Sequence, residues 1–368
     1  MSVLQHNDAD RHGILTVVII GLNSARTLEA CVRSVRQACR PRGKVPVIYV
    51  DGGSRDGSAE MATELGVDVI QLAHEYPTAG KGRNAGWKAA RTQFVQFVDS
   101  DTLLDPEWLA KGLEAIAASE QIAAVFGRLF EINPDGSIYN RVCNFDWYVP
   151  PGDRRYCGGN ALFRRNALWR ENGFGEDLVV GEEPELCRRL RARGFRIVCI
   201  DAVTGRHDLN MMRFAQYWRR GVRSGYAYAD IGLRFVLTDD KLWFRELARS
   251  AFTVPITAAA AAALTALLGL PGLLLAAAAV VGAVARKCVA LKERRIGFQD
   301  RLLYAMHSYF VKIPLFVGVV RWLAGRLLNR RVRNRRPGGT SAAASAGGSA
   351  TPLISQKGGT GEAGLRGA

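Results

Sequence analysis

Two aspartates one residue apart follow a strongly apolar run in the first third of the chain. The segment QFVQFVDSDTLLDPEWL, residues 93–109, leads directly into Asp99 and Asp101. In an extended segment, residues two apart point the same way, so both carboxylates would face one ligand. Hard oxygens paired in this way suit Mg²⁺ or Mn²⁺ bound to a diphosphate. The alternative is that Asp-Ser-Asp starts a turn and caps the helix expected from Pro106.

A second acidic pair stands directly before a proline. Glu182 and Glu183 precede Pro184 in GEEPELCRRLRARGFRI. Proline suits the first turn of a helix because its missing N–H would be unpaired there, which puts both glutamates at the mouth of a helix. They either compensate the helix dipole, which is worth about 0.3–1 kcal/mol, or supply an ionised carboxylate that takes the proton of an attacking hydroxyl.

Two further polar residues follow apolar runs. Asp51 comes after VIYV and before Gly52 and Gly53, so it is either a turn-forming residue or a ligand contact at the end of a strand. His207 comes after the run FRIVCI, in the segment TGRHDLN. A lone histidine is usually an ordinary packed or surface residue, and metal ligation is the alternative.

The segments that would position these residues alternate between strand and helix patterns. An apolar run at 14–20 is followed by apolar residues at helical spacing. The alternation continues with strands at 45–50, 67–72 and 94–98 and a helix near 84–91. Repeated strand-helix units predict an α/β fold with a doubly wound, mostly parallel sheet, whose ligands bind beyond the carboxyl ends of the strands.

Composition narrows the class of protein. With 368 residues and 48% hydrophobic content, the chain is long enough for one large domain and an accessory region. Of the net charge of +16, +12 lies between Arg286 and Arg336, where fourteen Lys and Arg stand against only two acidic residues. Because this charge flanks apolar segments, it favours membrane lipids and not nucleic acid as the partner. Seven scattered cysteines without a C-x-x-C pair fit a reducing cytoplasm.

An uncharged run, residues 251–285, predicts attachment to a membrane. One crossing needs only about 20 residues, and GLPG at 269–272 supplies a turn near the middle of the run. We therefore expect a helical hairpin that returns the following basic segment to the cytoplasm, as the positive-inside rule requires. Residues 302–328 are interrupted by charges and proline, so we expect an interfacial helix there or a third span. A buried soluble bundle is the alternative.

Six segments in a fixed order resemble those of family 2 glycosyltransferases of the GT-A fold. They are TVVIIGLNSARTLEACVRSV, VIYVDGGSRDGS, GKGRNAGWKAA, VDSD, CGGNALFRRNAL and GEEPELCRRLRARGFRI, within residues 14–208. Each segment is weak alone, and their order carries the resemblance. The resemblance implies an inverting, metal-dependent enzyme that moves a sugar from a nucleotide-diphosphate donor to a hydroxyl of a glycan or lipid-linked acceptor.

The resemblance also implies roles for the matching residues. On the donor side these are Asp51 for the nucleoside, Arg83 and Asn84 for the ribose or phosphates, Asp99 for the ribose or the Mg²⁺ or Mn²⁺ ion, and Asp101 and His207 for that ion. On the acceptor side they are Gly158, Gly159, Asn160, Trp218 and Arg219. Glu183 would be the catalytic base, with Glu182 in reserve.

Three departures from the family pattern qualify these roles. Gly52 stands where the family often has a second aspartate, so the nucleotide is open. Glu183 stands where the base is generally aspartate, which keeps the chemistry but changes its reach. Residues 216–220 read QYWRR, whereas processive polysaccharide synthases carry Gln-x-x-Arg-Trp. We therefore expect single sugar additions in exopolysaccharide or lipid-linked glycan assembly.

The expected organisation has four parts. These are an N-terminal extension (1–13, without the apolar core of a signal peptide), a catalytic domain (14–235), membrane-associated helices (236–330) and a disordered tail (331–368). The catalytic domain would face the cytoplasm at the inner membrane. Two other classes stay open. A sugar-nucleotide nucleotidyltransferase would carry a Gly-rich basic loop after the first strand, where this chain has GLNSART, and a non-catalytic membrane scaffold would not need these acidic residues.

Overall fold

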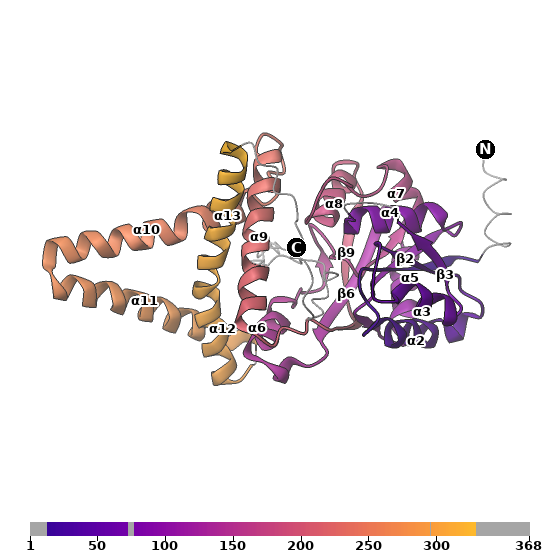
Figure 1. Cartoon of the computed structure of the whole chain (residues 1–368), viewed down its shortest axis with the longest axis horizontal. Coiled ribbons are helices and arrows are strands. Elements are labelled where there is room, and N and C mark those ends of the chain that lie inside the picture. The colour runs from indigo at the N-terminus through magenta and orange to yellow at the C-terminus, as the bar shows by residue number, and fades with distance from the viewer. Residues whose placement is uncertain (1–12, 73–76, 295, 329–368) are drawn as a thin grey trace, which may run out of the picture.

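The structure is a computed structural model that describes residues 13–72, 77–294 and 296–328. The predicted tail, and all but Gly13 of the predicted N-terminal extension, lie outside the described residues. Figure 1 shows an α/β domain at one end, a layer of helices beside it, and a long helical hairpin that projects from the far side of that layer.

The first half of the sheet is parallel and brings two of the aspartates to one edge. Its strands, in the order β3-β2-β1-β4, are β1 (Leu15–Gly21), β2 (Val47–Asp51), β3 (Asp68–Gln71) and β4 (Phe94–Asp99). The connecting helices are α2 (Leu28–Cys39), α3 (Ser58–Glu64) and α4 (Ala79–Ala89). Gly21 pairs with Asp51, and Ile20 pairs with Asp99. The carboxyl ends of β2 and β4 therefore flank the end of β1, as the alternating pattern predicts.

The second half of the sheet is mixed, not mostly parallel. It contains β5 (Thr102–Leu104), β6 (Ile122–Glu131), β7 (Gly152–Asp153), β8 (Leu162–Arg164) and β9 (Arg196–His207). β8 runs antiparallel to β4 and β6, β6 and β9 are parallel, and β5 and β7 each pair antiparallel with β9. β9 also continues through TGRH, so His207 lies within a strand and not in the loop after it. The predicted α/β class is confirmed.

Successive side chains of each central strand pack on opposite faces of the sheet. Val17 and Ile19 pack with α2 and with α5 (Trp108–Ala117) on one face. Val18 and Ile20 pack on the other face with α4 and with α8 (Glu182–Ala192). Both faces of these strands are buried, which explains why their sequences are continuous apolar runs and do not alternate with polar residues. α4 and α8 thus lie on the same face, beside the strand ends.

Three helices form the layer that supports the hairpin. α9 (Phe214–Arg234) and α13 (Lys312–Leu327) pack closely, since a Cβ atom added at Gly225 would come within 2.0 Å of the Leu315 carbonyl oxygen. α12 (Phe298–Phe310) packs near α6 (Ile138–Asp146). The short α7 (Arg165–Arg170) belongs to the α/β domain. The layer joins the α/β domain to the C-terminal helices through one shared apolar cluster.

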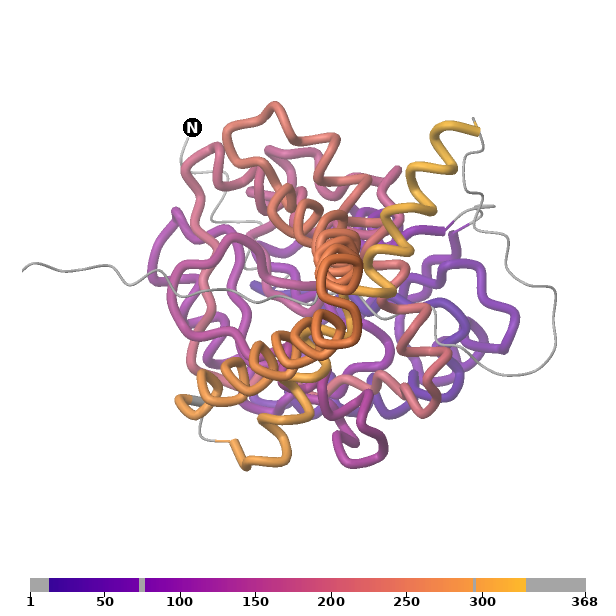
Figure 2. The backbone as a smooth tube through the Cα atoms, turned by 90° about the vertical axis from the view of Figure 1, so that its left-hand side faces the viewer, coloured from indigo at the N-terminus to yellow at the C-terminus, as the bar shows by residue number. Residues whose placement is uncertain are grey.

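The hairpin consists of α10 (Phe244–Leu268) and α11 (Leu270–Ala290), joined at Gly269. The stretches Phe244–Leu268, Leu270–Glu293 and Phe298–Leu327 are each long and apolar enough to cross a membrane. In the first two, at most 6% of the most apolar window is buried, against 44% in the third. Figure 2 views the hairpin nearly end-on, with α13 running across its base and not alongside it.

Candidate active site

Arg83 on α4 joins two carboxylates that are far apart in the sequence. Its Nη1 donates to Glu182 Oε1 at 2.6 Å and its Nη2 to Asp99 Oδ1 at 2.8 Å. Burial would lower the pKa of Arg83, but Asp99, Glu182 and Glu183 together raise it. Burial also raises the pKa of Glu182, and Arg83 opposes that shift. This buried, charge-assisted network fixes the mouth of α8 to the end of β4.

Asp99 is held on its other side by Asn160. Asn160 Nδ2 donates to Asp99 Oδ2 at 3.0 Å, and the Asp99 backbone N–H donates to Asn160 Oδ1 at 2.8 Å. The loop reaches this position through Gly158, whose φ of +84° favours glycine; Gly159 beside it is buried. Both carboxylate oxygens of Asp99 therefore have partners, which makes Asp99 a less suitable metal ligand than its neighbour.

Asp101 occupies different surroundings from Asp99 because Ser100 and Asp101 form a turn between β4 and β5. Thr102 pairs with His207 across β5 and β9, and His207 Nδ1 lies 3.0 Å from Asp101 Oδ1 and from Thr102 Oγ1. Burial would lower the pKa of His207, but Asp101 raises it. Within the described residues, His207 Nε2 is buried and forms no hydrogen bond, while Asp101 Oδ1 has only its ion pair with His207 Nδ1. A buried nitrogen without a hydrogen bond calls for a partner that protein residues do not provide.

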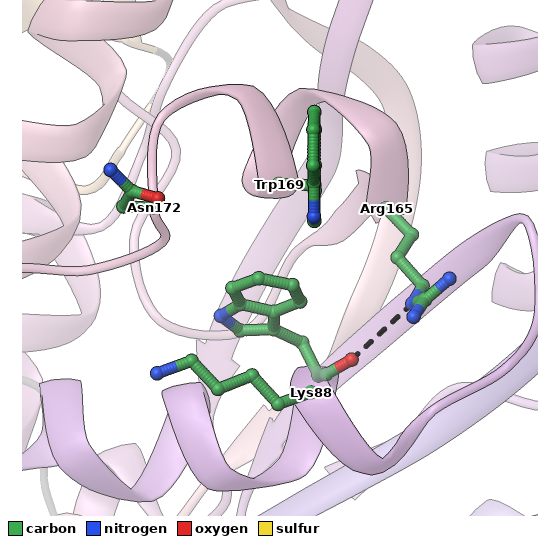
Figure 3. Close-up of a pocket in the computed structure, with 5 residues that line it drawn as sticks. Lys88, Arg165, Trp169 and Asn172 are labelled. Carbon is green, nitrogen blue, oxygen red and sulfur yellow. Dashed lines mark hydrogen bonds between the residues drawn. The ribbon is translucent and has the colours of Figure 1, made fainter.

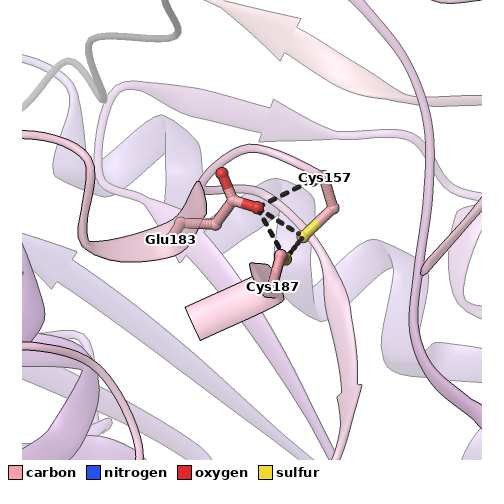
Figure 4. A group of neighbouring side chains, drawn as sticks. All are labelled: Cys157, Glu183 and Cys187. Carbon is pink, nitrogen blue, oxygen red and sulfur yellow. Dashed lines mark hydrogen bonds between the residues drawn. The ribbon is translucent and has the colours of Figure 1, made fainter. Parts of the chain in front are cut away.

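Glu183 lies at the first turn of α8, against two thiols (Figure 4). Its Oε1 accepts from the Cys157 backbone N–H at 2.7 Å, from the Cys157 thiol at 3.1 Å and from the Cys187 thiol at 3.0 Å. All hydrogen bonds that Glu183 accepts through its side chain within the described residues go to this one oxygen. Figure 4 shows the other oxygen pointing away from the thiols. The two cysteines are not among the predicted site residues.

Asp51 is used largely by its own turn. The backbone N–H groups of Gly53 and Ser54 donate to its Oδ2 at 2.9 and 2.8 Å, and Tyr49 and Ser54 hydroxyls donate to its Oδ1. The residue is 2% exposed. This geometry fits the turn-forming interpretation, in which Asp51 shapes the loop at the carboxyl end of β2.

Asn84 likewise holds a loop. Its Nδ2 donates to the Phe174 carbonyl oxygen and to Glu176 Oε1, both at 2.9 Å, and its Oδ1 accepts from the Phe174 N–H and Trp87 Nε1. Asn84 is the residue next to Arg83 on α4. Asn84 therefore anchors the segment that leads into α8, and within the described residues its side-chain hydrogen bonds do not go to the acidic residues of the site.

Two arginines on α9, which are not among the predicted site residues, lie near enough for their charges to act on the site. Arg220 acts on His207, and Arg223 interacts with Glu182. Desolvation by surrounding protein atoms lowers the pKa of Arg223, and the positive charge of Arg220 lowers it further. The residues expected on this segment behave differently: Arg219 is exposed and donates to the Ala215 carbonyl oxygen, and Trp218 packs against Phe214. The i, i+3 spacing of Arg220 and Arg223 was the available signal.

A hollow of about 380 Å³ lies apart from these residues (Figure 3). Trp87, Lys88 and Arg165 line it together with Trp169 and Asn172, and Arg165 Nε donates to the Trp87 carbonyl oxygen at 3.4 Å. None of the predicted site residues lines this hollow. The site is therefore defined by its buried polar network and not by the volume of a pocket.

Known proteins resemble this chain in sequence and in structure. Residues 16–171 match the family described as "Glycosyl transferase family 2". Glycosyltransferase AglE of Haloferax volcanii is 24% identical over 202 residues, which are 52% of this chain and 66% of that protein. Succinoglycan biosynthesis protein ExoO of Rhizobium meliloti is 34% identical over 113 residues, 30% of this chain and 32% of that protein. The chain thus matches less than two thirds of the length of these relatives.

A solved structure shares the fold over most of the chain. It is the mannosyltransferase PcManGT from Pyrobaculum calidifontis, in complex with GDP-Man and Mn²⁺. The alignment has a TM-score of 0.60 and 19% identity, and it covers 87% of this chain and 94% of that one. The likeness establishes the fold, a mixed α/β sheet of the GT-A type.

Proposed function

We propose that this chain, whose residues 16–171 make it a family 2 glycosyltransferase, transfers a sugar from a nucleotide-diphosphate donor to a hydroxyl of a glycan or lipid-linked acceptor, with inversion. One observation carries the proposal. Among the described residues, buried His207 Nε2 has no hydrogen-bond partner and Asp101 Oδ1 has only its ion pair with His207, at the same strand edge where Arg83 ties Asp99 to the mouth of α8. That edge is where α/β sheets bind nucleotides.

The donor set fits a divalent metal ion. Four carboxylates, those of Asp99, Asp101, Glu182 and Glu183, are buried in this region, and Arg83 is the cation that pairs with two of them. The excess negative charge needs compensation, because unpaired buried charge is costly. Asp101 and His207 would hold Mg²⁺ or Mn²⁺, which would neutralise charge on the leaving diphosphate. The structurally similar mannosyltransferase, described with Mn²⁺ and GDP-Man, supports this choice.

Glu183 is proposed as the base. Three donors fix its Oε1, so the carboxylate has one orientation and its Oε2 can take the proton of the acceptor hydroxyl. Glu182, by contrast, bonds Arg83. The two adjacent glutamates thus have separate tasks: Glu182 positions Arg83, and Glu183 accepts a proton. A single in-line displacement needs no covalent intermediate.

Arg220 and Arg223 are proposed to bind the diphosphate of the donor. Their charges act on His207 and Glu182 from α9, which bounds the site on the side of the helical layer. Arginine suits phosphate oxygens because its planar fork offers paired N–H donors. The acceptor would then enter along α9, where exposed Met212 and Phe214 and half-buried Trp218 provide an apolar border.

The membrane arrangement follows from the hairpin. α10 and α11 would cross the inner membrane. The start of α10, the end of α11 and the catalytic domain would then all face the cytoplasm. α13 lies across the base of the hairpin (Figure 2) and would rest in the interface, which matches the 44% buried apolar window of the Phe298–Leu327 stretch that contains it. A lipid-linked acceptor in this membrane would thereby lie close to α9.

The test is a panel of nucleotide sugars incubated with the full-length chain and a membrane extract, with Mn²⁺, with Mg²⁺ and with excess EDTA. We expect one donor class to release nucleoside diphosphate and to label a lipid or glycan fraction only with metal. Pyrophosphate turnover would favour a nucleotidyltransferase instead. No reaction with any donor would favour a scaffold.

A further inference from the structure

The proposed base Glu183 lies against two thiols that the transfer reaction does not need. The Sγ atoms of Cys157 and Cys187 are 3.7 Å apart, and Glu183 Oε1 lies 3.1 and 3.0 Å from them. All three residues are buried, with exposures of 9%, 0% and 5% for Cys157, Cys187 and Glu183. Two sulfurs and one carboxylate oxygen in one compact group are the ligands of a thiophilic metal.

The separation of the sulfurs is compatible with a shared metal ion and is longer than a disulfide bond. Two thiolates at 2.3 Å from one tetrahedral Zn²⁺ would lie about 3.8 Å apart, and the observed distance is 3.7 Å. A disulfide would need the sulfurs to approach to about 2.05 Å. The carboxylate oxygen would have to withdraw from each sulfur by only about half an ångström for tetrahedral coordination. The metal therefore fits with less movement than the disulfide.

The local folding explains why these three residues meet. Glu183 and Cys187 are four residues apart on α8 and so lie on the same face of that helix. Cys157 comes from the loop before β8, and its backbone N–H is hydrogen-bonded to Glu183. Three protein ligands leave one tetrahedral position for a water molecule, which is typical of an accessible zinc site and not of a closed structural one.

The geometry points to a second metal site, formed by Cys157, Glu183 and Cys187, that binds Zn²⁺ or another thiophilic cation and thereby inhibits transfer. Burial raises the pKa of Cys187 to about 12 and that of Cys157 well above the usual value of a thiol. Both cysteines are therefore thiols at neutral pH, and binding of one Zn²⁺ releases both protons to solvent. The bound ion engages the carboxylate that would otherwise accept the proton of the acceptor hydroxyl.

The binding part of this inference is independent of the proposed function, and the inhibitory part rests on it. The site is also chemically distinct from the Asp101 and His207 pair, which lacks sulfur. Mg²⁺ prefers oxygen ligands. An excess of Mg²⁺ therefore occupies the site at Asp101 and His207 and leaves the two thiols available to softer cations.

The test uses Co²⁺ as a spectroscopic substitute for Zn²⁺. The full-length chain in detergent, reduced with a phosphine and kept in excess Mg²⁺, is titrated with Co²⁺. We expect thiolate-to-Co²⁺ charge-transfer absorption that Zn²⁺ abolishes. Even an outer-shell change typically costs about 10- to 100-fold in metal affinity, so loss of a ligand in Cys187→Ser or Cys157→Ser should cost on the order of 100-fold or more. Cys199→Ser, a buried cysteine on β9, is the matched control and should bind normally.

Absence of the absorption in the unmodified chain would overturn the site, as would its persistence in both ligand variants. A Cys157–Cys187 disulfide found by peptide mapping of the chain isolated without reductant would overturn it too. In the second arm, Zn²⁺ is added to the transfer reaction in saturating Mg²⁺. We expect inhibition that Cys187→Ser relieves by about tenfold or more in Zn²⁺ concentration. If no donor is ever turned over, the proposed function fails while the Co²⁺ titration still decides the site.

Discussion

The α/β domain and the α10/α11 hairpin differ in which groups they leave without a partner. In the domain, charged groups are buried and paired: Arg83 is 1% exposed between two carboxylates. In the hairpin, large apolar side chains are exposed, with Leu267 at 79% and Val281 at 67%. Among the described residues, the groups still lacking partners are polar at His207 Nε2, beside Asp101, and apolar on the hairpin. A metal ion would satisfy the first and hydrocarbon the second.

The largest expected effect is on the polar side of this comparison. Asp101→Ala removes the carboxylate that would hold the metal beside His207. We expect transfer to fall by at least about 10³-fold, since it loses the charge stabilisation of the leaving diphosphate. Product formation from the donor identified in the panel is the measurement.

Asp68→Ala, an exposed aspartate on β3, is the matched control and should keep full activity. If Asp101→Ala were as active as the unmodified chain, and stayed so in excess EDTA, the metal assignment would be refuted.

The second-largest expected effect concerns the exposed apolar side chains of the hairpin. Val281→Arg puts a charge near the middle of α11, where insertion costs about 2.5–3.5 kcal/mol, so the membrane-bound fraction should fall. Val289→Arg places the same charge near the end of α11, where the side chain reaches the interface at little cost. Carbonate-resistant membrane association is the measurement. Equal retention of both variants would show that α11 does not cross the bilayer.

A smaller effect tests how closely α4 is packed against β1. A Cβ atom at Gly86 would meet Val18 Cγ1 at 2.2 Å, so Gly86→Ala should destabilise the domain by about 1–3 kcal/mol through overpacking. Gly82 is the matched control on the same helix, because a Cβ there meets Ile20 Cγ2 at 3.4 Å. Urea unfolding followed by tryptophan fluorescence compares them. Gly86→Ala with stability equal to that of Gly82→Ala would contradict the packing.

The smallest expected effect comes from a partly exposed ion-pair group. Asp240 is hydrogen-bonded to Arg155 and Arg191; burial would raise its pKa, but the two arginines lower it overall. A lowered pKa stabilises the fold above the ordinary aspartate value, and this stabilisation disappears as pH falls through the folded value. Asp240→Asn should therefore cost about 0.2–1 kcal/mol near pH 7. The difference from the unmodified chain should shrink towards pH 3, and a constant difference would contradict the shift.

The first half of the fold could be predicted because its signals are local. The apolar runs at 14–20 and 94–98 became β1 and β4, with Asp99 at the end of β4. The helix expected near 84–91 begins earlier, at Ala79, where the Thr78 side chain caps it by accepting from the Lys81 N–H. β9 was underestimated, since TGRH carries no apolar run and is held as a strand by pairing with β5 and β6.

The contacts of the candidate site could not be predicted in the same way, because most of them join distant segments. Arg83 reaches Glu182 across 99 positions, and Cys157 reaches Glu183 across 26. Only the i, i+4 relation of Glu183 and Cys187 is visible in the sequence. The extended geometry assumed for Asp99 and Asp101 was replaced by a turn, which gives the two aspartates different partners.

The most direct test of the central claim compares Glu183→Gln with Glu182→Gln. Each side chain keeps its size and loses its charge, so the pair separates the proposed base from the proposed partner of Arg83. Donor affinity is measured by calorimetry with metal present, and kcat from product formation. We predict that Glu183→Gln binds the donor normally and loses about 10²- to 10⁴-fold in kcat, while Glu182→Gln weakens donor binding. A Glu183→Gln enzyme with normal kcat, beside an inactive Glu182→Gln enzyme, would contradict the account.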